Sequence, residues 1–133
     1  GGEPSAHYYF REFGGADTGM LAALHVMAVA GRSDQPLSAL VASFARYAAS
    51  GEISTTVADQ ASVIDAVAAG FEGRGEADRV DGLTVSGPDW WLNVRSSNTE
   101  PLLRLNVEAR TEEQMVSLRD DALTIIRGAA AQH

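Results

Sequence analysis

The sequence predicts an α+β protein whose C-terminal part is a two-layer βαβββα domain, an antiparallel sheet with helices on one face. Apolar and polar residues alternate over 102–109, which is the period of a half-buried strand. Apolar residues recur every three or four positions over 59–71 and 111–126, which is the period of an amphipathic helix. Turns that contain glycine or proline separate these segments, and such an order of elements favours helices packed on an antiparallel sheet.

The first 50 residues predict a strand followed by two helices, which together precede that domain. An Asp-Thr pair can cap the first helix, and a glycine can end it. A proline suits the first turn of the second helix. In order, we expect a strand at 8–13, a helix from Asp17-Thr18 to Gly31, and a helix from Pro36 to Gly51. The domain boundary should lie between the two glycines.

The remaining residues supply the βαβββα unit. Asp59 can cap its first helix, while Thr111 and Gln114 match a capping box at the start of its last one. The polar stretch 72–78 predicts a loop. We expect strands at 53–57, 80–86, 90–95 and 102–109, a helix from Asp59 to Phe71, and a last helix with Met115, Leu118, Ala122 and Ile126 inward.

Composition excludes several classes of protein. The 133 residues contain no cysteine, which excludes disulfides and thiolate zinc sites, and no pair of histidines has the spacing of metal ligands. The net charge of −8 argues against binding to nucleic acid or to an acidic membrane surface. No apolar run approaches the roughly 20 residues of a membrane span. These features fit a cytoplasmic protein.

The stretch from Arg95 to Arg104 is a candidate anion site. It places two guanidiniums, three hydroxyls and a carboxamide between two apolar runs. Arginine suits phosphate because its planar fork donates hydrogen bonds in pairs and stays charged. The chain contains no lysine, so arginine is its only strong cation. The alternative is an ordinary hairpin loop, since Ser, Asn, Thr and Pro are common turn residues.

A second motif lies at the start of the chain, where Glu3, Ser5 and His7 alternate. On an extended segment, alternating side chains share one face. A carboxylate, a hydroxyl and an imidazole on one face can hydrogen-bond to sugar hydroxyls. Taken alone, the same residues also fit an ordinary polar strand end.

Together the two motifs resemble those of the α-D-phosphohexomutases, the superfamily of phosphoglucomutase and phosphomannomutase. Members carry a Gly-Glu-x-Ser-Gly-His loop in their third domain and an Arg-x-Ser-Asn-Thr-x-Pro loop in their fourth. The resemblance covers nearly the whole chain, but only the last quarter to third of a member. We therefore expect a fragment with a third-domain remnant of α/β type at 1–31, a helical linker at 32–50, and a C-terminal phosphate-binding domain at 51–133.

The resemblance implies a role for each matching residue. Phosphate would be held by Arg95, Ser97, Asn98, Thr99 and Arg104, and sugar hydroxyls by Glu3, Ser5 and His7. Two residues depart from the family pattern. Pro4 restricts the preceding residue, Glu3, to an extended conformation. Ala6 replaces the usual glycine. If that glycine adopts a positive φ, alanine would strain the loop.

The resemblance also implies the activity of a parent enzyme, which interconverts hexose 1-phosphates and 6-phosphates of mannose or glucose. In the family, a phosphorylated serine and a Mg²⁺ ion on an Asp-rich loop carry the phosphoryl transfer. Neither loop occurs in this sequence. We expect no catalytic residue here and no activity from the chain alone, with the missing N-terminal domains as its partners and a homodimer as another way to cover exposed strand edges.

Two alternatives remain at this point. One is phosphoglucosamine mutase, although the Ser-Asn-Thr form of the loop favours the phosphomannomutase/phosphoglucomutase branch. The other is a module that binds anions or forms oligomers without catalysis.

Overall fold

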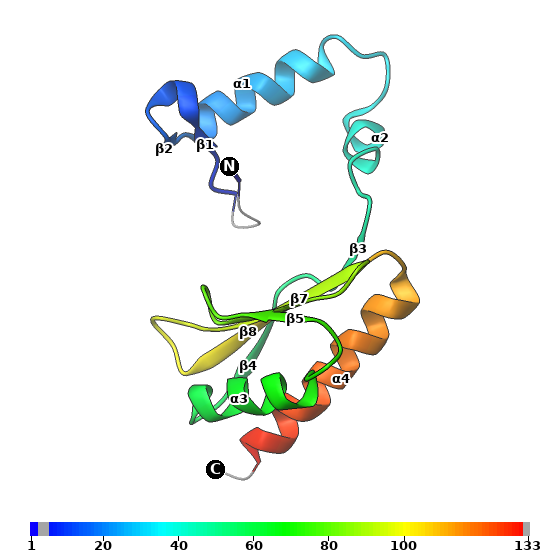
Figure 1. Ribbon diagram of the computed structural model, residues 1–133. Helices are drawn as coiled ribbons and strands as arrows, with labels where there is room; N and C mark the ends of the chain where they lie inside the picture. The colour runs from blue at the N-terminus through cyan, green and yellow to red at the C-terminus, as the bar shows by residue number, and fades with distance from the viewer. Residues whose placement is uncertain (3–5, 132–133) are drawn as a thin grey trace. The chain divides into compact units, whose positions relative to one another are not determined.

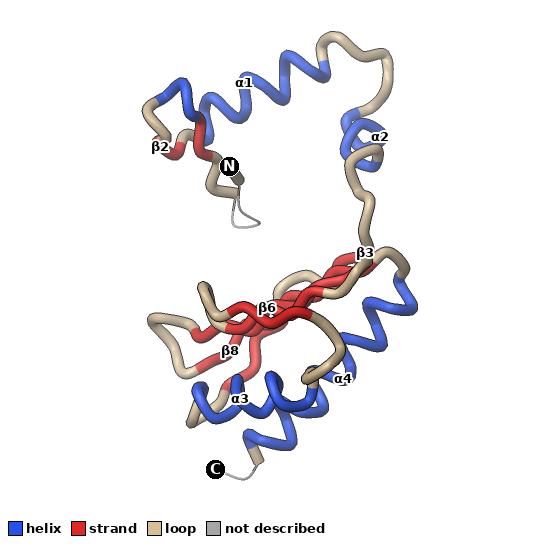
Figure 2. The backbone as a smooth tube through the Cα atoms, in the orientation of Figure 1, coloured by secondary structure: helices blue, strands red, loops and turns tan. Residues whose placement is uncertain are grey.

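A computed structural model describes residues 1–2 and 6–131 of the chain, which divide into two compact units, one ending at Ala45 and one beginning at Arg46. Figure 1 traces the order of the elements, and Figure 2 shows which segments are helix, strand or loop. The mixed α+β class that the sequence predicts is confirmed.

The first unit contains a small two-stranded sheet and two helices. Its elements are β1 (Tyr9–Phe10), a 3-10 turn (Arg11–Phe13), β2 (Ala16–Asp17), α1 (Gly19–Ala30) and α2 (Leu37–Ala42). The predicted strand at 8–13 is therefore too long. Gly14 and Gly15 both have positive φ, at 66° and 73°, and turn the chain back so that β2 pairs antiparallel with β1.

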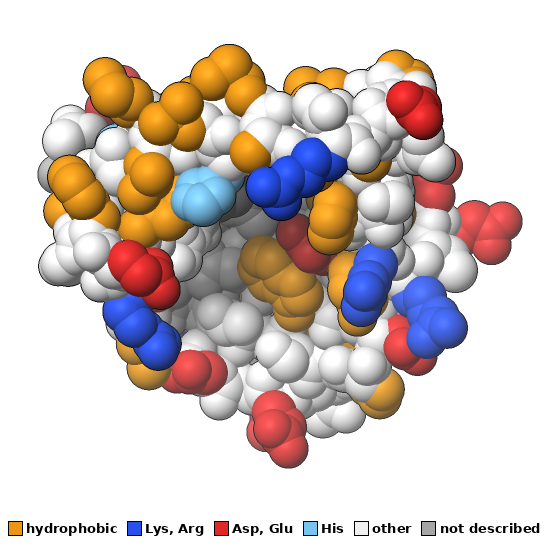
Figure 3. Space-filling view, turned by 90° about the horizontal axis from the view of Figure 1, so that it is seen from above, with side chains coloured by type: hydrophobic (Ala, Val, Ile, Leu, Met, Phe, Trp, Pro, Cys, Tyr) orange, Lys and Arg blue, Asp and Glu red, His pale blue; other side chains and the backbone are white. Residues whose placement is uncertain are grey.

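Helix α1 has the predicted caps, since the Thr18 hydroxyl accepts a hydrogen bond from the Leu21 N–H and Gly31 ends the helix. No residue of α1 is buried. Figure 3 shows many hydrophobic side chains on the face turned toward the viewer. The large apolar residues exposed within the first unit are Tyr8, Tyr9, Phe13, Met20, Leu24, Val26, Met27, Val29, Leu37, Val41 and Phe44.

The second predicted helix is also too long. Helix α2 spans six residues and ends at Ala42, and the hydroxyl of the capping residue Ser43 donates to the Leu40 carbonyl. No residue of α2 is buried, so its apolar positions gain nothing from a longer helix. Further on, β3 (Ala48–Ala49) pairs with the sheet of the second unit instead of continuing a helix.

The second unit is a six-stranded antiparallel sheet with two helices on one face (Figures 1 and 2). Its strand order is β3-β8-β7-β6-β5. Strand β4 also pairs with β8, along a different stretch of β8 from the one that pairs with β3. The strands that follow β3 are β4 (Ile53–Thr56), β5 (Glu76–Asp78), β6 (Leu83–Ser86), β7 (Trp90–Ser96) and β8 (Leu102–Ala109). The helices are α3 (Gln60–Gly70) and α4 (Glu112–Ala130).

Strand β5 corrects the prediction of a loop over 72–78. It lies at the sheet edge with all three residues exposed, so it lacks the apolar alternation by which a strand is recognised. The predicted strand 80–86 is shortened to β6, because Asp81 and Gly82 form a turn and Val80 is exposed.

The core lies between the sheet and the two helices, and all buried side chains of the described residues are apolar. Strand β8 alternates strictly, with Leu103, Leu105 and Val107 buried. The four inward positions predicted for the last helix are buried. Helix α3 buries Val63, Ile64 and Val67. Trp90 packs against Phe71 on the core side, with ring centroids 6.3 Å apart.

This packing predicts a large effect from a deletion on β7. Leu92→Ala should lower the free energy of unfolding of the second unit by about 2–5 kcal/mol, because Leu92 is fully buried and its loss leaves a cavity. Both tryptophans lie in β7, so their fluorescence during urea unfolding reports this unit. Val80→Ala, at a position 90% exposed, is the control and should change stability by less than about 0.5 kcal/mol.

Candidate anion site

Arg95 and Arg104 lie directly opposite each other on the β7–β8 pair. Their neighbours Val94, Leu103 and Leu105 point into the core, so strand alternation places both arginines on the sheet face opposite the helices. Their side chains are 38% and 32% exposed. Both arginines therefore lie on one sheet face near the mouth of the β7–β8 hairpin.

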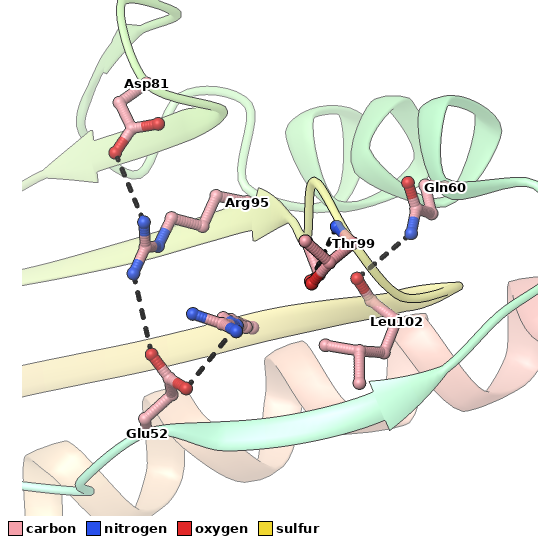
Figure 4. Close-up of polar contacts among 8 residues, drawn as sticks. Glu52, Gln60, Asp81, Arg95, Thr99 and Leu102 are labelled. Atoms are coloured by element: carbon pink, nitrogen blue, oxygen red, sulfur yellow. Dashed lines mark hydrogen bonds and ion pairs between the residues drawn. The ribbon is translucent and has the colours of Figure 1, made fainter.

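The loop between these strands carries the other predicted phosphate ligands. The Ser97 N–H donates to the Leu102 carbonyl at 2.9 Å and closes the loop. The hydroxyls of Ser97 and Thr99 are 3.5 Å apart, and Thr99 N–H is 3.5 Å from the Ser97 hydroxyl (Figure 4). Within the part of the chain that the structure describes, the N–H groups of Asn98 and Glu100 have no acceptor. The loop thus offers amide and hydroxyl donors to an anion.

Gln60, at the start of α3, anchors the far end of this loop, and the sequence analysis missed it. Its side-chain N–H₂ donates to the Leu102 carbonyl at 3.0 Å (Figure 4). It also donates to the Glu100 carbonyl at 3.2 Å. The Val57 N–H donates to the Pro101 carbonyl at 3.1 Å. These bonds hold the 100–102 side of the loop against the helical layer and leave the 97–99 side open.

Glu52 is the second residue that the sequence analysis missed. Its Oε2 lies 3.6 Å from a terminal nitrogen of Arg95, and its Oε1 lies 3.6 Å from Nε of Arg104 (Figure 4). That Nε is shielded from solvent and forms no hydrogen bond with any described residue. Both contacts are longer than hydrogen bonds, and an exposed ion pair of this kind contributes about 0–1 kcal/mol.

A β-bulge positions Glu52. Ala49 pairs with Glu108 and Ile53 pairs with Leu105, so three residues oppose two across this stretch of β8. Gly51 adopts φ of 67°, and the Ser50 hydroxyl accepts from the Val107 N–H. Such a bulge re-aims the side chain that follows it. In the sequence, the isolated glycine Gly51 beside a predicted strand was the signal for this bulge.

Asp81 approaches Arg95 from the other side, at 4.0 Å, and was also missed (Figure 4). The Asn93 side chain donates to the Asp81 carbonyl and to the Thr84 hydroxyl, which fixes this turn to the open sheet face. Gly82 adopts φ of 69°, and a Cβ there would lie 2.4 Å from the Val94 carbonyl oxygen. The Asp-Gly pair itself was a turn signal.

In the first unit, His7 donates from Nδ1 to the carboxylate of Asp17, which also accepts from the Tyr8 N–H at 2.9 Å. The hydrogen bond from His7 and then that from Tyr8 lower the pKa of Asp17 below its ordinary value. Glu3 and Ser5, the other predicted sugar ligands, lie outside the described residues. Ala6 has φ of 66°, so this position does adopt the conformation that glycine would take without strain.

The other titratable residues add no further site. His25 is exposed and stacks on Phe10 at 5.3 Å, in keeping with a structural or surface role. Over 1–2 and 6–131, no three His, Asp or Glu side chains are grouped closely enough to hold a metal ion. The same residues include no helix that combines the length and apolarity needed to cross a membrane.

Comparison with known proteins identifies the family. Residues 52–125 match the model of the phosphoglucomutase/phosphomannomutase C-terminal domain. The chain belongs to the phosphoglucomutase/phosphomannomutase family. Residues 1–47 match the α/β/α domain III of the same family. The resemblance inferred from the two motifs is therefore confirmed.

Individual relatives agree with this assignment. A phosphomannomutase from Salmonella typhimurium is 45% identical over 125 residues, which are 92% of this chain and 27% of the relative. The phosphohexose mutases of Xanthomonas campestris are 40% identical over 131 residues, 96% of this chain and 29% of theirs. A family protein from Burkholderia thailandensis, 27% identical, superimposes with a TM-score of 0.75 over 96% of this chain and 28% of its own. The chain spans somewhat more than a quarter of the length of these relatives.

The Asp81–Gly82 turn yields the first prediction for this site. Gly82→Ala should lower the stability of the second unit by about 2 kcal/mol or more, because the methyl group meets backbone atoms of β7 and the residue must keep a positive φ. Gly128→Ala is the matched control, since it lies in α4 with open space around it, and it should raise stability by about 0.5–1 kcal/mol. Urea unfolding followed by tryptophan fluorescence measures both.

The second prediction concerns the pH dependence of the His7–Asp17 contact. A lowered pKa means that the fold favours the ionised carboxylate, so the contact should be complete above about pH 4 and lost as pH falls through the lowered value. The Tyr8 amide shift in ¹⁵N spectra should report that titration. Asp17→Asn should abolish it, whereas a midpoint above the usual aspartate range would contradict this geometry.

Proposed function

We propose that this chain is the phosphate-holding C-terminal part of a phosphohexomutase that interconverts hexose 1-phosphates and 6-phosphates. The observation that carries the proposal is the opposition of Arg95 and Arg104 at the mouth of a loop with the family's Ser-Asn-Thr string. The relatives named phosphomannomutase favour mannose phosphates, with glucose phosphates as further substrates.

In this proposal the two arginines and the loop hold the phosphate that is not reacting. The guanidiniums supply charge-assisted hydrogen bonds, and Ser97, Asn98 and Thr99 supply neutral donors around them. A cluster of this kind recognises a dianion without distinguishing the sugar carbon to which it is attached. Binding the remote phosphate places the reacting end of the substrate and so lowers the entropic part of the barrier.

The first unit would contribute separately to sugar recognition, through Glu3, Ser5 and His7. Asp17 accepts the hydrogen bond from Nδ1 of His7 and so orients the imidazole. In a parent enzyme, Mg²⁺ and the phosphorylated serine would come from other domains. Among the described residues, no three His, Asp or Glu side chains are grouped closely enough to hold that ion.

Phosphate binding by the isolated chain tests this proposal. We expect millimolar affinity, equivalent to about 4 kcal/mol, because the site is open to solvent and each contact is screened. Inorganic phosphate and mannose 1-phosphate should shift the Ser97, Asn98 and Thr99 amides alike, and added salt should weaken binding. Chemical-shift titration of the ¹⁵N-labelled chain measures this.

Arg95→Ala should remove most of this binding. Arg110→Ala is the control, since Arg110 is 73% exposed and pairs with Asp89 rather than with the loop. If the shifts centre on Trp91 or α4 and the loop amides do not move, the loop is a structural turn. The chain alone should show no mutase turnover.

A further inference from the structure

We propose that Glu52 is an internal counter-ion of the anion site and that an incoming phosphate group displaces it. This inference rests on the proposed function, because it adds a competitor to the same two arginines. It follows from the two contacts of the Glu52 carboxylate, which reaches toward Arg95 with one oxygen (Figure 4) and toward Arg104 with the other.

The need for a counter-ion follows from the strand pairing. Arg95 and Arg104 are directly opposed, and like charges in that position destabilise a sheet. Asp81 contacts only Arg95, at 4.0 Å, and is 76% exposed, so it cannot compensate both cations. Glu52 contacts both, and the bulge at Ser50–Gly51 places it between them.

The geometry of these contacts also makes Glu52 displaceable. Both distances are 3.6 Å, longer than hydrogen bonds, and the carboxylate is 41% exposed. The shielded Nε of Arg104 has no hydrogen-bond acceptor among the described residues. A phosphate oxygen could accept from it at the usual charge-assisted distance of about 2.7–2.9 Å. The anion would therefore form bonds that the carboxylate does not.

Competition, rather than assistance, is the effect that the supporting contacts favour. Asp81 lies 4.0 Å from Arg95, and this contact does not involve Glu52. Arg104 lies within β8, between the buried Leu103 and Leu105, and its position does not depend on Glu52. Removing the negative charge of Glu52 should thus leave the arginines in place and make them more attractive to phosphate.

A competing carboxylate would keep phosphate binding weak in every state of the site. An enzyme that must hold either phosphate of the same sugar, and release it again, benefits from weak binding at the site that grips the non-reacting end. On this proposal, Glu52 sets the affinity of the site and the two arginines set its selectivity for anions.

Titration of the ¹⁵N-labelled 133-residue chain with inorganic phosphate tests the proposal, using the loop amides of 97–99 as reporters. Glu52→Gln keeps the shape of the side chain and removes its charge, and we expect phosphate to bind threefold to tenfold more tightly. The dependence of binding on salt should also steepen, because the site then carries more positive charge. The variant should unfold at a lower temperature than the wild type.

Glu108→Gln is the matched control. This substitution removes the same charge from the open face of β8. Glu108 accepts a hydrogen bond from Trp91 and has no contact with Arg95 or Arg104. Its phosphate affinity should match the wild type. Glu52→Asp is a second test, which keeps the charge. Because its shorter side chain withdraws the carboxylate from the arginines, this variant should bind phosphate with an affinity between those of the wild type and Glu52→Gln. It also serves if Glu52→Gln does not fold.

The outcomes separate this inference from the function on which it rests. If Arg95→Ala abolishes phosphate binding but Glu52→Gln binds no more tightly than Glu108→Gln, the counter-ion proposal is wrong and the proposed function stands. If Glu52→Gln binds more weakly than the wild type, Glu52 orients the arginines and does not compete, which also overturns it. If the wild-type loop amides do not respond to phosphate, the proposed function fails.

Discussion

The register between β7 and β8 is the constraint on which the candidate site depends. Leu92 and Val94 on one strand, and Leu103 and Leu105 on the other, are buried against the helices. Because side chains alternate across a strand, this burial sends the intervening arginines to the open face. A slip of one residue would expose the apolar side chains and bury a guanidinium, so the hydrophobic core enforces the position of the charges.

The open face carries its polar groups as cross-strand pairs along β7 and β8. Arg95 faces Arg104, Asn93 faces Asn106, and Trp91 faces Glu108. Only the first of these pairs places like charges together, and there two carboxylates approach from neighbouring elements. An acidic chain with ten arginines thus gathers two of them at one loop and neutralises them locally. An anion would enter such a site by exchange with a carboxylate, not by attraction to an uncompensated positive surface.

The two units differ in how much of their structure rests on burial. The second unit has a continuous apolar core between one sheet and two helices. The first unit keeps large apolar side chains exposed on α1 and α2, and its local order comes from caps, turns and the hydrogen bonds of Asp17. Burial therefore stabilises the second unit, whereas the first unit rests on local hydrogen bonds.

The sequence by itself determined the elements whose signals are local. Caps at Thr18, Asp59 and Thr111, and the strict alternation of β8, predicted α1, α3, α4 and that strand correctly. It also located the arginine pair and the loop between them, and the two motifs together indicated the family.

The tertiary structure alone decided the features that depend on distant partners. Strand β3 follows from its pairing with β8, and the exposed edge strand β5 has no periodic signal. Gln60 meets the loop some 42 residues later in the chain, and Glu52 reaches Arg95 and Arg104 only because a bulge re-aims it. Periodicity records which face of an element is buried, but it does not record which charged side chains that burial brings together on the opposite face.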